Sequence, residues 1–201
     1  MIEQRDDRKA LRVVLLGAES TGKSTLAAAL GRETGWPLVA EAARTWASRV
    51  NRPLTAFDVS TIAAIHLQER QSVLLAANHR GVAGILLDTD LLATRVYARH
   101  YHQIDPAWLR DAAAACRGDL YLLCADDFPF RSEEGQRGAE TDRSVIQEAM
   151  QRAVAVSQAW VVWISGSPEE RLAAAMEAIS EYAETKTAGA AESGSGGSEE
   201  S

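Results

Sequence analysis

The sequence VVLLGAESTGKSTLAAAL, residues 13–30, divides into three parts. An apolar run leads into a loop between Gly17 and Gly22, and an alanine- and leucine-rich segment follows from Lys23. The pattern G-x-x-x-x-G-K-[ST] between a buried strand and a helix is typical of a phosphate-binding P-loop. At ordinary residue usage, a random chain of this length matches the bare pattern about once in a hundred. We therefore expect a nucleoside triphosphate site at this loop.

Each residue type in the loop has a physical role. Gly17 and Gly22 permit backbone angles that a side chain would disfavour, so successive amides can point inward around a phosphate. Lys23 is expected to reach the β and γ phosphates, and the Ser24 hydroxyl is expected to be a ligand of Mg²⁺. The expected ATP-binding residues are Gly17, Glu19, Ser20, Thr21, Gly22, Lys23, Ser24 and Thr25.

Length, composition and charge favour one globular domain and a small ligand. The 201 residues, 46% of them hydrophobic, can bury one good core. The net charge of −7 argues against nucleic acid as a partner, because duplex binding normally needs a basic surface. The charged N-terminus has no apolar segment behind it, and no apolar run reaches the length that crosses a membrane. The sequence therefore predicts a cytoplasmic protein without membrane contact.

Short apolar runs alternate with helical patterns along the chain, which is typical of a parallel sheet built from βαβ units. The predicted fold is α/β, a three-layer P-loop NTPase or kinase fold in which helices flank a five-stranded parallel sheet. The strands are expected at residues 11–17, 37–41, 82–90, 119–124 and 160–165. The helices are expected at residues 23–34, 58–80, 92–102, 106–117, 142–158 and 168–182.

Two segments are expected to lie outside this regular pattern. Residues 125–140 combine charges, a proline and glycines, and such a long loop in a compact domain is usually functional. We expect a lid there that excludes water and brings Arg137 or Arg143 to the phosphates. From Thr185 onward the chain becomes rich in Gly, Ser and Glu, so the sequence predicts a kinase domain at 1–184 and a disordered tail at 185–201.

The sequence separates a kinase from two other P-loop classes. A GTPase of the Ras type needs an N-K-x-D segment, and the sequence has none. A mechanical ATPase usually has an acidic pair directly after its Walker B strand. The third expected strand of this chain instead ends in Asp88-Thr89-Asp90. A small kinase remains, in which an acceptor pocket adjoins the P-loop and carboxylates act on Mg²⁺ and on the acceptor hydroxyl.

Two carboxylates stand at the carboxyl ends of expected strands, where ligands bind in open α/β sheets. Asp88 is expected to hold Mg²⁺ and Glu41 to act on the acceptor, although which of the two is the general base stays open. The alternatives are a helix cap for Asp88 and an exposed helix start for Glu41. Arg44 follows Glu41 by one helical turn and is expected either to pair with it or to contact substrate.

Five blocks of the sequence resemble one known family. GAESTGKSTLAAAL, PLVAEAARTW, LLDTDLLATRVYARHY, DLYLLCADDFPF and EGQRG are similar, in this order, to blocks of AAA-like P-loop kinases related to the ribosylnicotinamide kinase domain of NadR-type NAD-biosynthesis proteins. The resemblance covers about residues 12–175. It implies transfer of phosphate from ATP to the ribose 5′-hydroxyl of nicotinamide riboside, which gives nicotinamide mononucleotide. By the resemblance, Glu41 and Arg44 match the acceptor block, Asp88 and Asp90 the acidic block, and Arg137 the lid arginine.

The chain departs from the family pattern in two places. Its lid has Phe130 where the family commonly has Trp, and it is one residue longer. Only about ten residues precede the first strand, whereas NadR-type proteins carry a nucleotidylyltransferase domain there, so a stand-alone kinase domain is expected. Another nucleoside or nucleotide as acceptor, or a regulatory ATP-binding module, stays open. The many apolar helix positions also leave room for a homo-oligomer.

Overall fold

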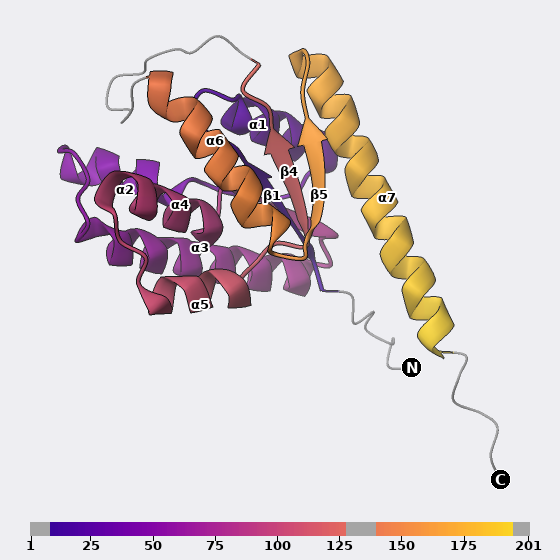
Figure 1. Cartoon of the computed structure of the whole chain (residues 1–201). Coiled ribbons are helices and arrows are strands. Elements are labelled where there is room, and N and C mark those ends of the chain that lie inside the picture. The colour runs from indigo at the N-terminus through magenta and orange to yellow at the C-terminus, as the bar shows by residue number, and fades with distance from the viewer. Residues whose placement is uncertain (1–8, 128–139, 195–201) are drawn as a thin grey trace.

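Five parallel strands form one sheet at the centre of the molecule (Figure 1). The computed structural model describes residues 9–127 and 140–194. Strand β1, which leads into the P-loop, lies in the middle of the sheet in the order β2-β3-β1-β4-β5. The strands are β1 (Leu11–Leu16), β2 (Leu38–Val39), β3 (Gly84–Asp88), β4 (Leu120–Cys124) and β5 (Trp160–Ile164).

Helices cover both faces of this sheet and so make a three-layer structure (Figure 1). Apolar residues of α1 and α7 pack on one face, and those of α3, α4 and α6 pack on the other. No helix in the described residues has the length and apolar character needed to cross a membrane. The helices are α1 (Lys23–Thr34), α2 (Ala42–Val50), α3 (Asp58–Arg80), α4 (Leu91–His102), α5 (Ala107–Ala115), α6 (Glu140–Ala155) and α7 (Pro168–Gly194).

The apolar run before the P-loop is buried because β1 is covered on both sides. Val13 and Leu15 belong to the core beneath α1 and α7, and Val14 and Leu16 belong to the opposite core. All four side chains are fully buried. Alternate residues of a strand point to opposite faces, so a central parallel strand has to be apolar at every position.

The predicted fold class is confirmed, and each of the five strands lies within its expected segment. All five strands are shorter than expected, and the difference is largest for β2, which contains only Leu38–Val39, and for β3, which begins at Gly84 and ends at Asp88. The nine-residue helix α2 was not among the expected helices, although Glu41 and Arg44 were expected to lie one helical turn apart. Residues 128–139, which include most of the expected lid and Arg137, lie outside the described residues.

The C-terminal helix requires one correction to the predicted tail. Helix α7 continues to Gly194, whereas the sequence analysis ended it at Tyr182 and expected disorder from Thr185. The added segment contains Lys, Glu and several alanines, which have high intrinsic helix propensity and can prolong a helix that is already nucleated. The domain boundary at residue 184 stays a prediction.

Candidate functional site: a P-loop beside a deep cavity

Two glycines have the backbone conformations that the phosphate loop needs. Gly17 has φ of 145°, and a Cβ atom there would lie 2.8 Å from the carbonyl oxygen of Cys124 and 2.9 Å from Oγ1 of Thr21. Gly22, directly before α1, has φ of 80°. Both positions therefore require glycine, one for space and conformation and the other for conformation.

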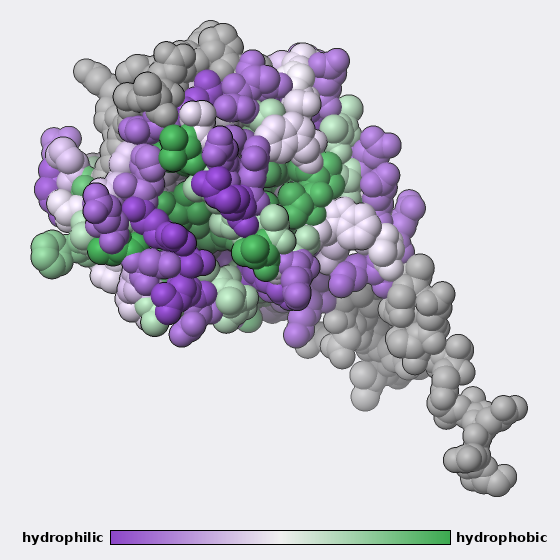
Figure 2. All heavy atoms as spheres, in the orientation of Figure 1, coloured by the Kyte–Doolittle hydropathy of each residue, from purple (hydrophilic) through white to green (hydrophobic). Residues whose placement is uncertain are grey.

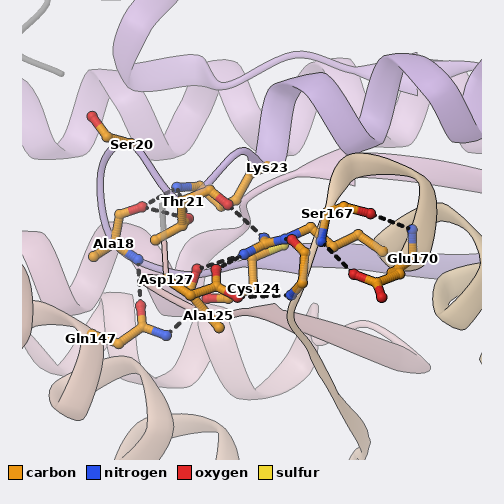
Figure 3. A network of polar contacts seen from close by, with 12 residues as sticks. Ala18, Ser20, Thr21, Lys23, Cys124, Ala125, Asp127, Gln147, Ser167 and Glu170 are labelled. Atoms are coloured by element: carbon orange, nitrogen blue, oxygen red, sulfur yellow. Dashed lines mark hydrogen bonds and ion pairs between the residues drawn. The ribbon is translucent and has the colours of Figure 1, made fainter. Parts of the chain in front are cut away.

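Polar side chains from α6 and α7 hold the carbonyls and amides of the loop in place (Figure 3). Gln147 accepts from the amide of Ala18 at 2.8 Å and donates to the carbonyl of Cys124 at 2.9 Å. Arg143 donates to the carbonyl of Ser20 at 3.2 Å. The loop is thus fastened to α6, and the sequence analysis had not singled out Gln147.

Arg171 of α7 is the most deeply buried cation at the site, with 2% of its surface exposed. Its guanidinium donates to the carbonyl of Thr21 at 2.8 Å, to that of Ala125 at 3.2 Å, and to the carboxylate of Asp127. These contacts join the P-loop, the end of β4 and the start of α7. The start of α7 is itself fixed by a capping box between Ser167 and Glu170 (Figure 3).

Ser24 and Asp88 form the direct link between the P-loop and strand β3. The Ser24 hydroxyl donates to Oδ2 of Asp88 at 2.7 Å, and β3 pairs with β1 so that Leu15 faces Asp88. Oδ1 of Asp88 is buried and has no hydrogen-bond partner within the described residues. Mg²⁺ prefers hydroxyl and carboxylate oxygens, so this pair fits the expected metal site.

Lys23 lies at the start of α1 with its ammonium turned back into the loop. Its Nζ atom donates to the carbonyl of Ala18 at 2.5 Å and lies 3.4 Å from Oγ1 of Thr21. Only 7% of the residue is exposed. The ammonium therefore already stands inside the ring of loop amides, where phosphate oxygens bind.

Asp90 has the contacts of a helix cap, and its expected contact with substrate stays a prediction. Its carboxylate caps α4 by accepting from the amides of Leu92 and Ala93, and it accepts from the Tyr121 hydroxyl at 2.5 Å. Complete burial raises the pKa of this carboxyl. Thr89 has φ of 70°, and this left-handed residue separates Asp88, at the P-loop, from Asp90, in the core. The DTD block thus supplies one site residue and one helix cap.

A cavity of about 1100 Å³ opens beside the P-loop. Its lining combines residues 19–25 of the loop with residues of α2, of the segment 51–54, and of α3, α4 and α7. Glu41 and Arg44 both line it, and their side chains form an ion pair of 3.3 Å. The expected acceptor residues and the expected ATP loop therefore face one continuous space.

Two tyrosines of α4 form an aromatic wall of the cavity. The rings of Tyr97 and Tyr101 are parallel within 1°, and their centroids lie 6.0 Å apart. Burial raises the pKa of Tyr97, and the nearby charges of Glu41, Glu19 and Asp88 raise it further. The Tyr97 phenol is therefore neutral and close to these carboxylates, which places acidic and aromatic groups together.

His66 of α3 is a buried polar residue of the cavity lining that the sequence analysis missed. Its Nε2 atom has no hydrogen-bond partner within the part of the chain that the structure describes. Burial lowers its pKa to about 4, with a smaller contribution from the charge of Arg70. The imidazole is thus neutral at pH 7. Its position in a long helical pattern gave no signal of a site.

The segment 51–58, which closes the cavity between α2 and α3, is organised around Asp58. The carboxylate accepts from both terminal nitrogens of Arg52 at 2.8 Å, from the Trp46 indole at 2.9 Å and from the Thr55 amide at 2.7 Å. These partners hold the pKa of Asp58 well below its usual range. The segment is consequently a fixed wall of the cavity.

Comparisons with known proteins agree with this architecture. A family model described as AAA domain matches residues 12–171. A NadR protein solved in complex with NR is 26% identical over 87% of this chain and 50% of that chain, with a TM-score of 0.68. A NadR protein in complex with NAD and AMP-PNP is 25% identical over 87% of this chain and 49% of that chain, also with a TM-score of 0.68.

A thymidylate kinase from Ehrlichia chaffeensis shares the fold at 11% identity, over 79% of this chain and 88% of that chain, with a TM-score of 0.58. Our chain spans about half the length of the NadR chains that it matches. A search of curated protein sequences finds no match.

Proposed function

This chain belongs to the AAA domain family and has a NadR-like P-loop kinase fold, and we propose that it transfers the γ-phosphate of ATP to the ribose 5′-hydroxyl of nicotinamide riboside. The observation that carries the proposal is the single cavity that joins the P-loop to Glu41 and an aromatic wall. A phosphate donor at the loop and a hydroxyl acceptor beside Glu41 would share that space.

On the donor side, the loop supplies its backbone amides and the ammonium of Lys23, and Glu19 is its one acidic side chain. The amides of the loop and the N-terminus of α1 would hold the β and γ phosphates. Lys23 would exchange its contact with the Ala18 carbonyl for phosphate oxygens, which are stronger acceptors for an ammonium. Ser24 and Asp88 would hold Mg²⁺, which would neutralise the charge that develops on the transferred group.

On the acceptor side, Glu41 is the carboxylate placed to orient the hydroxyl and to take its proton. Its ion pair with Arg44 is half exposed on the arginine side, so a substrate can compete for that arginine. Tyr97 and Tyr101 offer flat apolar surface against which a planar base can pack. His66 offers a neutral imidazole whose ring nitrogens can bond to polar groups of the acceptor.

The test is an acceptor panel assayed with ATP and Mg²⁺. Nicotinamide riboside, adenosine, cytidine, uridine, thymidine and thymidine monophosphate are each incubated with the purified chain, ADP release is measured, and products are identified by mass spectrometry. We expect turnover with nicotinamide riboside to exceed that with the other acceptors at least tenfold. Lys23→Ala serves as the control and should lower turnover by orders of magnitude, because it removes a charge-assisted phosphate contact.

Other outcomes of the panel would redirect the proposal. Preferred turnover of a different nucleoside or nucleotide would keep the kinase and change its acceptor. ATP binding without turnover of any acceptor would favour a regulatory ATP-binding module. Normal turnover in a folded Lys23→Ala protein would contradict the assignment of the P-loop itself.

A further inference from the structure

A second cavity, of about 740 Å³, lies between α4, α5 and α6. We call it the arginine cavity, because its charged lining consists of Arg95, Arg99, Arg110, Arg117 and Arg152, with His100 beside them. Figure 2 shows the side of the molecule on which these helices face the viewer, with hydrophilic side chains gathered around apolar surface. The volume is within the range of small-molecule sites.

The charge of the cavity lining is positive, whereas the net charge of the whole chain is negative. The chain has 28 Asp and Glu against 21 Lys and Arg, yet no carboxylate of the described residues lines the arginine cavity. The cavity beside the P-loop, in contrast, contains both signs. A concave surface with one sign of charge attracts ligands of the opposite sign more strongly than a flat one.

A single carboxylate forms ion pairs with three of the guanidinium groups. Asp105 binds Arg95 through two hydrogen bonds of 2.7 and 2.8 Å, and it lies 3.7 Å from Arg99 and 4.0 Å from Arg110. The three cations lower the pKa of Asp105. Within this group a single negative charge faces three positive charges, and Arg99 and Arg110 have only long contacts to it.

The remaining arginines do not cancel this excess. Arg117 donates to the carbonyl of Ser157 at 2.5 Å, and this acceptor carries no net charge. Arg152 pairs with Glu148 at 3.2 Å on the surface, where both side chains are more than 60% exposed. The cavity therefore presents guanidinium groups that can bind an anion while their present partners stay in place.

The floor of the arginine cavity is apolar. Leu92 and Val96 come from α4, Ala113 from α5, and Ala149 and Ala153 from α6. Guanidinium groups bind phosphate oxygens in pairs, and an apolar floor favours a hydrophobic or aromatic body. We propose that the arginine cavity binds a small molecule that carries a phosphate group on an aromatic or aliphatic body.

This site is separate from the candidate active site, but one helix borders both. Tyr97 and Tyr101 of α4 line the cavity beside the P-loop, whereas Arg95, Arg99 and Val96 of the same helix line the arginine cavity. The proposal does not depend on the proposed kinase activity. Binding can therefore be measured while the P-loop is kept filled.

The experiment uses phenyl phosphate as the probe and the full chain saturated with AMP-PNP and Mg²⁺. Isothermal titration calorimetry should show one bound phenyl phosphate per chain. The double variant Arg99→Gln/Arg110→Gln should weaken this binding at least tenfold, while Arg95 still pairs with Asp105 and keeps the local structure. Arg32→Gln, which changes an exposed arginine of α1, should leave it unchanged.

A second variant tests the charge argument by an expected increase in affinity instead of a decrease. Asp105→Asn removes the shared carboxylate, so phenyl phosphate should bind more tightly than to the wild type, by about threefold or more. A role of the cluster in folding alone would not produce tighter binding. The proposal is overturned if the wild type does not bind phenyl phosphate, or if the double variant binds as well as the wild type.

Discussion

The 2.7 Å contact between Ser24 and Asp88 assigns a testable role to Asp88. In Asp88→Asn the charge of the carboxylate is lost but its shape remains, so Mg²⁺ should bind more weakly. We expect the Mg²⁺ concentration for half-maximal turnover to rise at least tenfold, and excess metal to restore part of kcat. A Mg²⁺ titration of the initial rate measures this, and a loss of kcat that no metal concentration relieves would instead make Asp88 the general base.

Glu41 should show a different kinetic effect. Glu41→Gln keeps a hydrogen-bonding side chain at the start of α2 but removes the base, so kcat should fall about 100-fold or more while the KM for ATP and the Mg²⁺ requirement stay unchanged. Steady-state kinetics with the best acceptor of the panel measure both constants. A change confined to the KM for the acceptor would mean that Glu41 only positions the substrate.

The lowered pKa of His66 predicts that the stability of the protein depends on pH. Its folded pKa of about 4 lies below its ordinary value of 6.5, so between these values the unfolded chain binds a proton that the folded chain does not. The free energy of unfolding should therefore fall as the pH drops from 6.5 to 4, by up to about 3 kcal/mol, and should not depend on His66 above pH 6.5. Urea unfolding of the wild type and His66→Gln at pH 7.5 and pH 5 measures the difference.

The matched control for this prediction is His79→Gln, because His79 is an exposed histidine of the same helix. The stability of His79→Gln should follow the wild type at both pH values. An equal pH dependence in His66→Gln and the wild type would show that His66 is not the group responsible.

At the scale of elements, the features that could be predicted from the sequence are those that depend on neighbouring residues. The apolar runs predicted all five strands, and the G-x-x-x-x-G-K-[ST] spacing predicted the loop between β1 and α1, because both depend on neighbouring residues. Gln147 and Arg171 could not be predicted in this way. Their partners, Ala18 and Thr21, lie more than 100 residues away in the chain, and spacing carries no information about such contacts.

The same reasoning explains the two aspartates after β3. A DTD block before a helix is compatible with a metal site and with a helix cap, and the sequence does not show which carboxylate turns inward. The left-handed conformation of Thr89 decides this by directing Asp88 to Ser24 and Asp90 to the amides of α4.

Helix α7 should support the nucleotide site through Arg171. Arg171→Lys keeps the charge but cannot reach Thr21, Ala125 and Asp127 together, since an ammonium lacks the planar fork of a guanidinium. We expect a loss of about 3 kcal/mol in the free energy of unfolding and a higher KM for ATP. Arg152→Lys is the control, because its exposed pair with Glu148 should change stability by less than about 0.5 kcal/mol. Unfolding curves and ATP titrations of both variants decide the point.

At the scale of the whole molecule, the end of α7 should be dispensable. The described contacts of Thr185 and Lys186 stay within the helix, from the Thr185 hydroxyl to the Glu181 carbonyl and from Lys186 to the Tyr182 ring. A chain that ends at residue 184 should keep its turnover, and its Tm should shift by no more than about 2 °C. Thermal unfolding and the kinase assay test this, and a clear loss of either property would mean that the segment packs against the rest of the protein.

The attachment of the P-loop to Gln147 and Arg171 has a consequence for the newborn protein. The ribosome makes the loop before it makes the two helices that hold it. At about 5–20 residues per second, roughly 7 to 30 seconds separate the synthesis of the loop from that of α7. During this interval the carbonyl of Thr21 and the amide of Ala18 lack their long-range partners. A nascent chain therefore acquires its nucleotide site only after α7 has been made, although the motif that specifies the site is made well before that helix.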